Sequence, residues 1–531
     1  MSLDDRLNLT SFQSLRRIAL SILTLFVVIK LIFALVATID RPQIQGKFEL
    51  YQTNLVLEAA EWKPTDDLQG LSALQTSLIG ADFLKSATEQ YQTARKTDVQ
   101  AINKISTSLT NPALTDPDPK SAEFKAVQLR QTITAAQTEI DNIDLRIGIL
   151  QAAQKQPETA IKTWQKIVSN STQAKPKNTA ASLIEIWQKS SSINANTTPQ
   201  IEAEINSNFD GWFRDRVLHQ LYTNIGDKAE LGQLDRIEQA TAENALIKLA
   251  TIFTSRVLFG LGGLGLIIYF TVRLIIRVIQ KESTESVADL VLTGLKTPWT
   301  APWDWEIVWQ VFMVGFFFVG QFLLPLIFSQ FVNPSKLTTQ SQSIYVFSSY
   351  AIMAGLGIGV LYLSIKSYFP LPADWFKFNW KSNWILWGVG GYLVATPIVI
   401  VVSLLNEQIW KGQGGSNPIL QIVLEGKDPI ALLLFFLTAA VAAPLFEEFL
   451  FRGFLLPSLT RYVPVWGSIG LSGLLFGVAH LSFSEIIPLT TLGIILGVVY
   501  TRTRNLLAPM LLHSLWNSTT LISLYILGSA S

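Results

Sequence analysis

The sequence predicts an all-α protein: a polytopic membrane helix bundle with an inserted soluble helical domain. Hydrophobic residues make up 49% of the 531 residues, and the mean hydropathy of +0.33 is too high for a soluble globular chain. Several apolar segments are long enough to cross a bilayer, which takes about 20 helical residues. Between the first two of these segments lies a long polar region with helical periodicity.

Residues 1–40 are expected to form an N-terminal tail and a transmembrane anchor. The polar tail ends at Arg16 and Arg17, and residues 18–39 are apolar almost throughout. This apolar run is longer than the core of a signal peptide, and no small-residue cleavage site follows it. We therefore expect the anchor to stay attached to the chain.

Residues 41–249 are expected to form a soluble helical domain, because the composition changes there to Gln, Asn, Thr, Ala and Lys. Apolar residues recur at helical spacing between Ile143 and Ile167. The stretch LRIGILQAAQKQPETAIKTWQKIV resembles one tetratricopeptide helix hairpin, with Pro157 at a helix start. Two interpretations stay open: a generic helical domain and a partner-binding repeat module.

Residues 250–382 are expected to contain further transmembrane helices and loops, and residues 383–531 a C-terminal membrane core. About nine spans are expected, at residues 18–39, 251–272, 307–328, 345–365, 384–405, 430–459, 466–481, 486–500 and 506–526.

The distribution of basic residues predicts the orientation of these spans. If each span crosses the membrane, Arg273, Arg461 and Arg504 fall on the same side as Arg16 and Arg17. The positive-inside rule then places the N-terminus in the cytoplasm. The soluble domain is expected on the other side, in a periplasm or lumen.

The overall composition excludes several function classes. The net charge of +1 does not indicate a nucleic-acid-binding protein. The absence of cysteine excludes disulfides, thiolate metal sites and a cysteine nucleophile.

Three charged residues interrupt the apolar stretch APLFEEFLFRGFLLPSL, which begins at Ala443. A charged side chain at bilayer depth costs roughly 2.5–3.5 kcal/mol on insertion scales, so such residues are rare and often functional. Glu448 and Arg452 lie four residues apart on one helical face and are expected to form a buried pair. Glu447 points about 100° away and is left to act as a general base.

Two of the three histidines follow in equally apolar sequence, at His480 and His513. The chain is expected to turn near Pro464, which puts His480 and Glu447 at similar depth in an antiparallel hairpin. His513 and Asn517 lie four residues apart and can present two donors to one point.

These motifs resemble those of the CPBP intramembrane proteases, a family that includes type II CAAX prenyl proteases, bacteriocin-processing enzymes and abortive-infection proteins. EEFLFR matches the EExxxR motif, FGVAH the FxxxH motif and HSLWN the HxxxN/D motif. The resemblance covers roughly residues 430–526 and makes 383–531 the protease core.

The resemblance implies a role for each matched residue. Glu447 and His480 would activate a water that attacks the scissile peptide carbonyl. His513 and Asn517 would hold the developing oxyanion, while Glu448 and Arg452 would support the site. The expected substrates are proteins or peptides in the membrane. The family pattern does not account for residues 41–249, and our hypothesis is that this domain recruits or screens a partner or substrate.

Two alternatives remain open for the same residues. In the first, Glu447, His480 and His513 bind zinc as two imidazoles and a carboxylate with an open water position. The metal-free mechanism, which needs no cofactor, is favoured because no HExxH pair occurs and Asn517 is best used as a donor. In the second alternative, the chain is a non-catalytic membrane scaffold or immunity protein.

Overall fold

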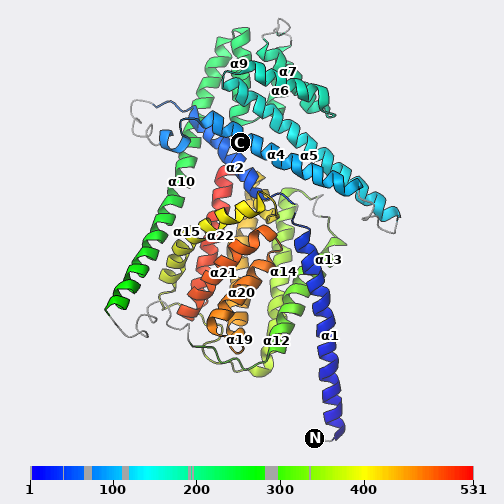
Figure 1. Cartoon of the computed structure of the whole chain (residues 1–531), viewed down its shortest axis with the longest axis vertical. Helices are drawn as coiled ribbons and strands as arrows, with labels where there is room; N and C mark the ends of the chain where they lie inside the picture. The colour runs from blue at the N-terminus through cyan, green and yellow to red at the C-terminus, as the bar shows by residue number, and fades with distance from the viewer. Residues whose placement is uncertain are drawn as a thin grey trace. The chain divides into compact units, whose positions relative to one another are not determined.

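The computed structural model describes residues 3–39, 41–64, 75–110, 119–188, 193, 197–280, 297–333 and 337–529 (Figure 1). Every regular element within these residues is a helix, so the predicted all-α class is confirmed. The chain divides into two compact units. One joins the N-terminal residues up to Arg41 to Arg256–Tyr525, and the other contains Pro42–Ser255 and the residues from Ile526 onward.

The second unit contains the following labelled helices among the described residues, the last of them only in part. They are α2 (Ile44–Ala60), α4 (Phe83–Thr110), α5 (Pro119–Ala153), α6 (Pro157–Asn170), α7 (Ala174–Trp187), α8 (Thr198–Asn208), α9 (Gly211–Ile225) and α10 (Lys228–Ile279). Trp164 lies in its core with no exposed surface, and its Nε1 donates to the Leu145 carbonyl at 3.1 Å. Gly148 makes room for this indole, since a Cβ there would lie 2.1 Å from Nε1.

The tetratricopeptide interpretation of this unit is not confirmed. Helix α6 does begin at Pro157, with the proline in its first turn. However, α5 is 35 residues long, which exceeds a whole two-helix repeat of about 34 residues. The stretch is therefore a junction between one long and one short helix.

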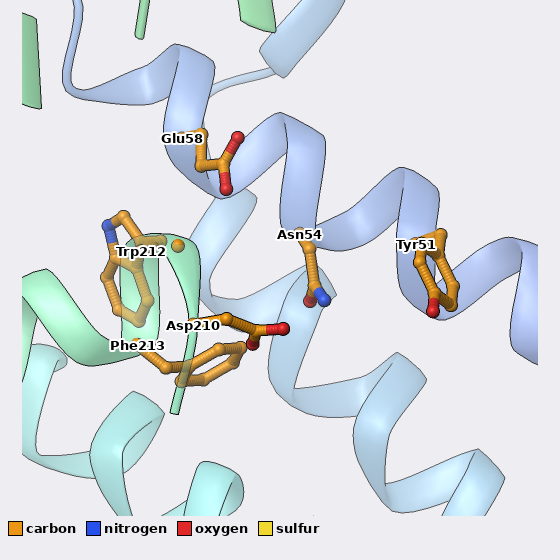
Figure 2. Close-up of a pocket in the computed structure, with 7 residues that line it drawn as sticks. Tyr51, Asn54, Glu58, Asp210, Trp212 and Phe213 are labelled. Atoms are coloured by element: carbon orange, nitrogen blue, oxygen red, sulfur yellow. The ribbon is translucent and has the colours of Figure 1, made fainter. Parts of the chain in front are cut away.

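A small pocket lies where α2 meets the start of α9, between Glu58 and the segment Asp210–Phe213 (Figure 2). Glu58 is only 6% exposed, and its Oε2 has no hydrogen-bond partner among the described residues. Gly211 has a φ of +49°, and a Cβ at this position would lie 2.2 Å from Oε1 of Glu58. Glycine is therefore required where α9 begins against this carboxyl group.

The first unit contains the rest of α10 and the remaining helices. They are α1 (Leu3–Val36), α12 (Trp305–Gln310), η3 (Val311–Leu323), α13 (Leu324–Ser329), α14 (Thr339–Ile365), η5 (Lys366–Tyr368), α15 (Trp384–Trp410), α16 (Pro418–Glu425), α17 (Pro429–Phe436), η6 (Leu437–Ala442), α18 (Ala443–Glu448), η7 (Phe449–Leu455), α19 (Leu456–Leu459), α20 (Val465–Ala479), α21 (Phe483–Thr503) and α22 (Leu507–Gly528).

Seven helices of the described chain are long and apolar enough to cross a membrane, fewer than the nine spans expected. Helix α20 has only 15 residues, which rise about 22 Å against a hydrocarbon thickness of about 30 Å. Helix α22 is not among the seven either; polar residues such as His513, Asn517 and Thr519 interrupt its apolar sequence.

The helix that carries the motif begins at a capped first turn and contains two π-helical stretches. Asp428 accepts hydrogen bonds from the backbone N–H groups of Ile430 and Ala431, each at 2.9 Å, and Pro429 occupies the first turn. From there α17, η6, α18, η7 and α19 form one apolar helix of 31 residues, in which η6 and η7 are π-helical. The two glutamates lie in α18, between these wider turns.

Helices α20 and α21 lie side by side in the bundle, as Figure 1 shows. Their backbones meet at Gly473 and Gly493, where a Cβ on Gly493 would lie 2.8 Å from the Gly473 Cα. Small residues permit this approach, as is typical of membrane helix pairs. At this position of α21 the Gly493 carbonyl accepts a hydrogen bond from Arg452 of the motif helix.

Candidate active site

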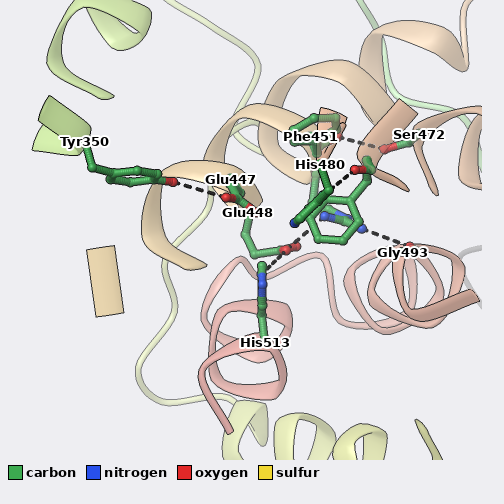
Figure 3. Close-up of polar contacts among 10 residues, drawn as sticks. Tyr350, Glu447, Glu448, Phe451, Ser472, His480, Gly493 and His513 are labelled. Atoms are coloured by element: carbon green, nitrogen blue, oxygen red, sulfur yellow. Dashed lines mark hydrogen bonds and ion pairs between the residues drawn. The ribbon is translucent and has the colours of Figure 1, made fainter. Parts of the chain in front are cut away.

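Glu448 lies at the centre of the polar cluster and accepts two hydrogen bonds on one oxygen (Figure 3). Arg452 Nη1 donates to Oε1 at 2.9 Å, which confirms the pair expected from their spacing. His513 Nδ1, from α22, lies 2.9 Å from the same oxygen. Since a carboxylate only accepts, the hydrogen of His513 is on Nδ1. Glu448 therefore links α18 to α22 through a residue 65 positions later in the chain.

Arg452 is fully buried and reaches beyond its own helix. Its Nη2 donates to the Gly493 carbonyl of α21 at 3.0 Å. Its guanidinium also lies over the Phe476 ring, 4.6 Å from the centroid. The guanidinium therefore neutralises Glu448, and its contacts with Phe476 and Gly493 connect the motif helix to α20 and α21.

Glu447 is half-buried and is not part of this ion pair. The hydroxyl of Tyr350, on α14, donates to its Oε1 at 3.1 Å (Figure 3). Its Oε2 is buried and has no hydrogen-bond partner among the described residues. The Oε2 of Glu448 is likewise buried without a hydrogen-bond partner among the described residues, so the two carboxylates differ in their charge partners: Glu448 pairs with Arg452, and Glu447 accepts from a neutral hydroxyl.

His480 ends α20 and is anchored by its own helix. Its Nδ1 lies 2.8 Å from the Phe476 carbonyl, which can only accept, so Nδ1 carries the hydrogen. The neutral ring then presents an Nε2 lone pair, as a general base requires. Glu485, at the start of α21, lies near enough to His480 for the two side chains to interact electrostatically.

The Phe476 ring holds the two imidazoles near one another. Its centroid lies 4.8 Å from that of His480 and 5.5 Å from that of His513, both in edge-on geometry. Phe476 itself has no exposed surface. The first residue of the FxxxH motif therefore serves as the apolar partner of both histidines and of Arg452.

Asn517 and His513 form hydrogen bonds with different acceptors. Its Nδ2 donates to the Ala439 carbonyl in η6 at 2.7 Å, whereas His513 contacts Glu448. The two side chains, which sequence spacing places on one face, thus have separate acceptors in this conformation. Asn517 instead fixes α22 to the π-helical turn ahead of the glutamates.

The zinc alternative requires Glu447, His480 and His513 to converge as ligands. Among the described residues, no three His, Asp or Glu side chains are gathered closely enough to hold a metal ion. This conformation therefore does not present a formed zinc site.

Tyr350 was not among the residues predicted from sequence. It lies 97 positions before Glu447, on a helix without a charged motif, so no local spacing relates the two. Glu485 was also missed, although it follows His480 by only five residues. A single acidic residue at a helix start usually indicates favourable placement at the positive end of the helix dipole.

Fold and site together define a class: a polytopic α-helical membrane protein with a carboxylate–imidazole centre of the kind used in general acid–base chemistry. Residues 429–519 match the family model described as type II CAAX prenyl endopeptidase, Rce1-like. The C-terminal part of the chain is therefore similar to the Rce1-like CAAX proteases, which are intramembrane endopeptidases.

Two relatives agree with this assignment. The chain is 28% identical over 215 residues to the membrane-embedded CAAX protease MroQ of Staphylococcus aureus (strain USA300), covering 39% of this chain and 85% of the relative. It is 21% identical over 138 residues to the putative membrane peptidase YdiL of Bacillus subtilis (strain 168), covering 26% of this chain and 55% of the relative. No solved structure matches.

Proposed function

We propose that this protein is an intramembrane endopeptidase that cleaves membrane-associated proteins with a water activated by Glu447 and His480. The observation that carries the proposal is that Glu447 forms no ion pair with Arg452 and keeps an unpartnered Oε2, whereas the neighbouring Glu448 is already paired with Arg452 and His513. The water gives a proton to Glu447 while its oxygen bonds to the carbonyl carbon. The C–N bond then breaks, and the proton passes to the leaving amine. The names of the two relatives, a protease and a peptidase, support this chemistry.

His513 is proposed to stabilise the oxyanion when it is protonated. With one hydrogen on Nδ1 directed at Glu448, a neutral ring offers only a lone pair at Nε2. The imidazolium form carries a second N–H there, which would donate to the oxyanion. Asn517 would join the oxyanion site only after leaving the Ala439 carbonyl.

One observation favours the zinc version as a second candidate. Both histidines direct Nδ1 at an oxygen acceptor, as metal-binding histidines commonly do, and both leave Nε2 available. We favour the metal-free mechanism because the three residues are not gathered as ligands. Cleavage that is lost on chelation and restored by zinc, with zinc bound to the purified protein, would decide for the metal.

The test compares cleavage products in membranes that contain the wild-type protein or Glu447→Gln. We expect fragments that appear only with the wild type, because the amide cannot accept the proton of the water. Glu425→Gln, in α16 outside the polar cluster, is the matched control and should cleave like the wild type. Identical fragment profiles from folded, inserted wild type and Glu447→Gln would favour the scaffold or immunity alternative.

The domain of residues 41–249 lies outside the matched family region. We propose that it recruits or screens protein substrates on the extracytoplasmic side. Deleting it without changing the cleavage of any substrate would remove this role.

A further inference from the structure

We propose that Tyr350 is a positioning residue for the reaction: its hydroxyl holds one oxygen of Glu447 and thereby fixes the other as the atom that accepts the proton. The inference rests on the proposed function of Glu447. Tyr350 belongs to none of the three sequence motifs, and it reaches the site from α14.

The packing of α14 supports this role. Tyr350 and Gly357 are seven residues apart and share one face of the helix. A Cβ on Gly357 would lie 2.9 Å from the Phe446 ring, so the helices meet closely at this glycine. Tyr350 contacts the same ring edge-on, with 6.2 Å between centroids. Phe446 directly precedes Glu447, so this face of α14 is held against the backbone of the proposed base.

The chemistry of the contact distinguishes the two oxygens of Glu447. The Tyr350 hydroxyl donates to Oε1 at 3.1 Å, which satisfies that oxygen and limits rotation of the carboxylate. Oε2 has no hydrogen-bond partner among the described residues. A hydrogen bond from a hydroxyl stabilises an ionised carboxylate more than a protonated one.

The experiment uses the full chain in proteoliposomes and a quenched fluorescent peptide. The peptide spans the cleavage site found by comparing wild-type and Glu447→Gln membranes. Tyr350→Phe removes one oxygen and keeps the ring, so we expect kcat to fall about 10-fold while KM stays unchanged. The acid-side limb of the pH–rate profile should move to higher pH. Tyr362→Phe, an exposed tyrosine on the same helix, should match the wild type in all three quantities.

A second variant covers the case in which Tyr350→Phe does not fold. Replacing Tyr350 with 3-fluorotyrosine keeps the shape but makes the hydroxyl a stronger donor, so the acid limb should move to lower pH.

The outcomes separate the inference from the proposed function. An unchanged kcat, or a lower kcat without movement of the acid limb, would show that Tyr350 only packs against the site and would overturn the inference. An acid limb that 3-fluorotyrosine leaves in place would overturn it equally. Cleavage that persists in Glu447→Gln would instead overturn the proposed function, and the inference with it.

Discussion

Arg452 shows how a full charge is held inside this helix bundle. It has no exposed surface and contacts Glu448, the Gly493 carbonyl and the face of Phe476. A buried ion pair stabilises the folded state little more than an apolar pair of the same volume, but removing one partner leaves an uncompensated buried charge. The pair is therefore a point where single substitutions should be costly.

Replacing Arg452 with methionine tests this cost. Arg452→Met leaves the Glu448 carboxylate buried with His513 as its only remaining partner, so we expect a loss of about 3–5 kcal/mol in the free energy of unfolding. Thermal and denaturant unfolding in detergent would measure it. Arg273→Met, which removes an exposed arginine, should stay near the wild type.

A double variant separates charge from packing in the same measurement. Glu448→Gln combined with Arg452→Met removes both charges and should recover most of the stability. It should not recover cleavage, since His513 then lacks its carboxylate. A double variant as unstable as Arg452→Met alone would contradict the charge argument.

Sequence predicted the contacts of this site only where they depend on local spacing. Glu448 and Arg452 are four residues apart on one helix, so their pairing follows from helical geometry. The contact of His513 with Glu448 spans 65 residues, and that of Tyr350 with Glu447 spans 97. Such contacts depend on how helices cross, and helix periodicity carries no information about that.

Among the helices, proline accounts for irregular winding that apolar periodicity does not indicate. The stretches η3, η6 and η7 end at residues 323, 442 and 455, each two positions before Pro325, Pro444 or Pro457. Proline cannot donate to the carbonyl four residues earlier, and its ring clashes with that carbonyl, so the preceding turn widens. Pro397 lies inside an α-helix without such a stretch, so packing also contributes.

The junction of α2 and α9 in the unit Pro42–Ser255 gives a pH-dependent prediction. Burial, together with the negative charge of nearby Asp215, raises the pKa of Glu58 to about 8. The folded chain therefore retains a proton that the unfolded chain releases between about pH 4.5 and pH 8. Stability should fall as the pH rises through this window. Glu58→Gln should flatten this fall and stabilise the protein at pH 8.5 by on the order of 2 kcal/mol.

Thermal unfolding of the full chain between pH 5 and pH 9 would measure the effect. Glu89→Gln, which changes an exposed carboxylate on α4, should keep the slope of the wild type. Equal slopes for Glu58→Gln and the wild type would show that Glu58 is not the titrating group.

For the whole molecule, composition predicted the helical class correctly, and seven of the nine expected spans are, within the described residues, helices long and apolar enough to cross a membrane. Hydropathy alone counts every apolar run, whereas α20 is too short to cross on its own. The tetratricopeptide resemblance is not confirmed for a related reason. It rests on one turn at Pro157, and that local signal cannot show that α5 continues for 35 residues.

The orientation of the chain can be tested with single cysteines, since the natural sequence has none. Lys166, on α6, and Lys381, before α15, are both exposed lysines. The positive-inside rule places Lys381 in the cytoplasm and the soluble domain with Lys166 outside. In intact cells with a permeable outer layer, an impermeant maleimide should label Lys166→Cys at once. It should label Lys381→Cys only after the membrane is opened.

The reverse labelling pattern would invert the topology and remove the extracytoplasmic recruiting role proposed for residues 41–249. Labelling of both cysteines in intact cells would show that the membrane was not sealed. A cytoplasmic marker protein that stays unlabelled is the control for a sealed membrane. The expected pattern would place the active-site helices between a cytoplasmic end rich in arginine and an outer domain able to meet substrates first. Substrates that depend on residues 41–249 should then expose their contact region on the outer side of the membrane.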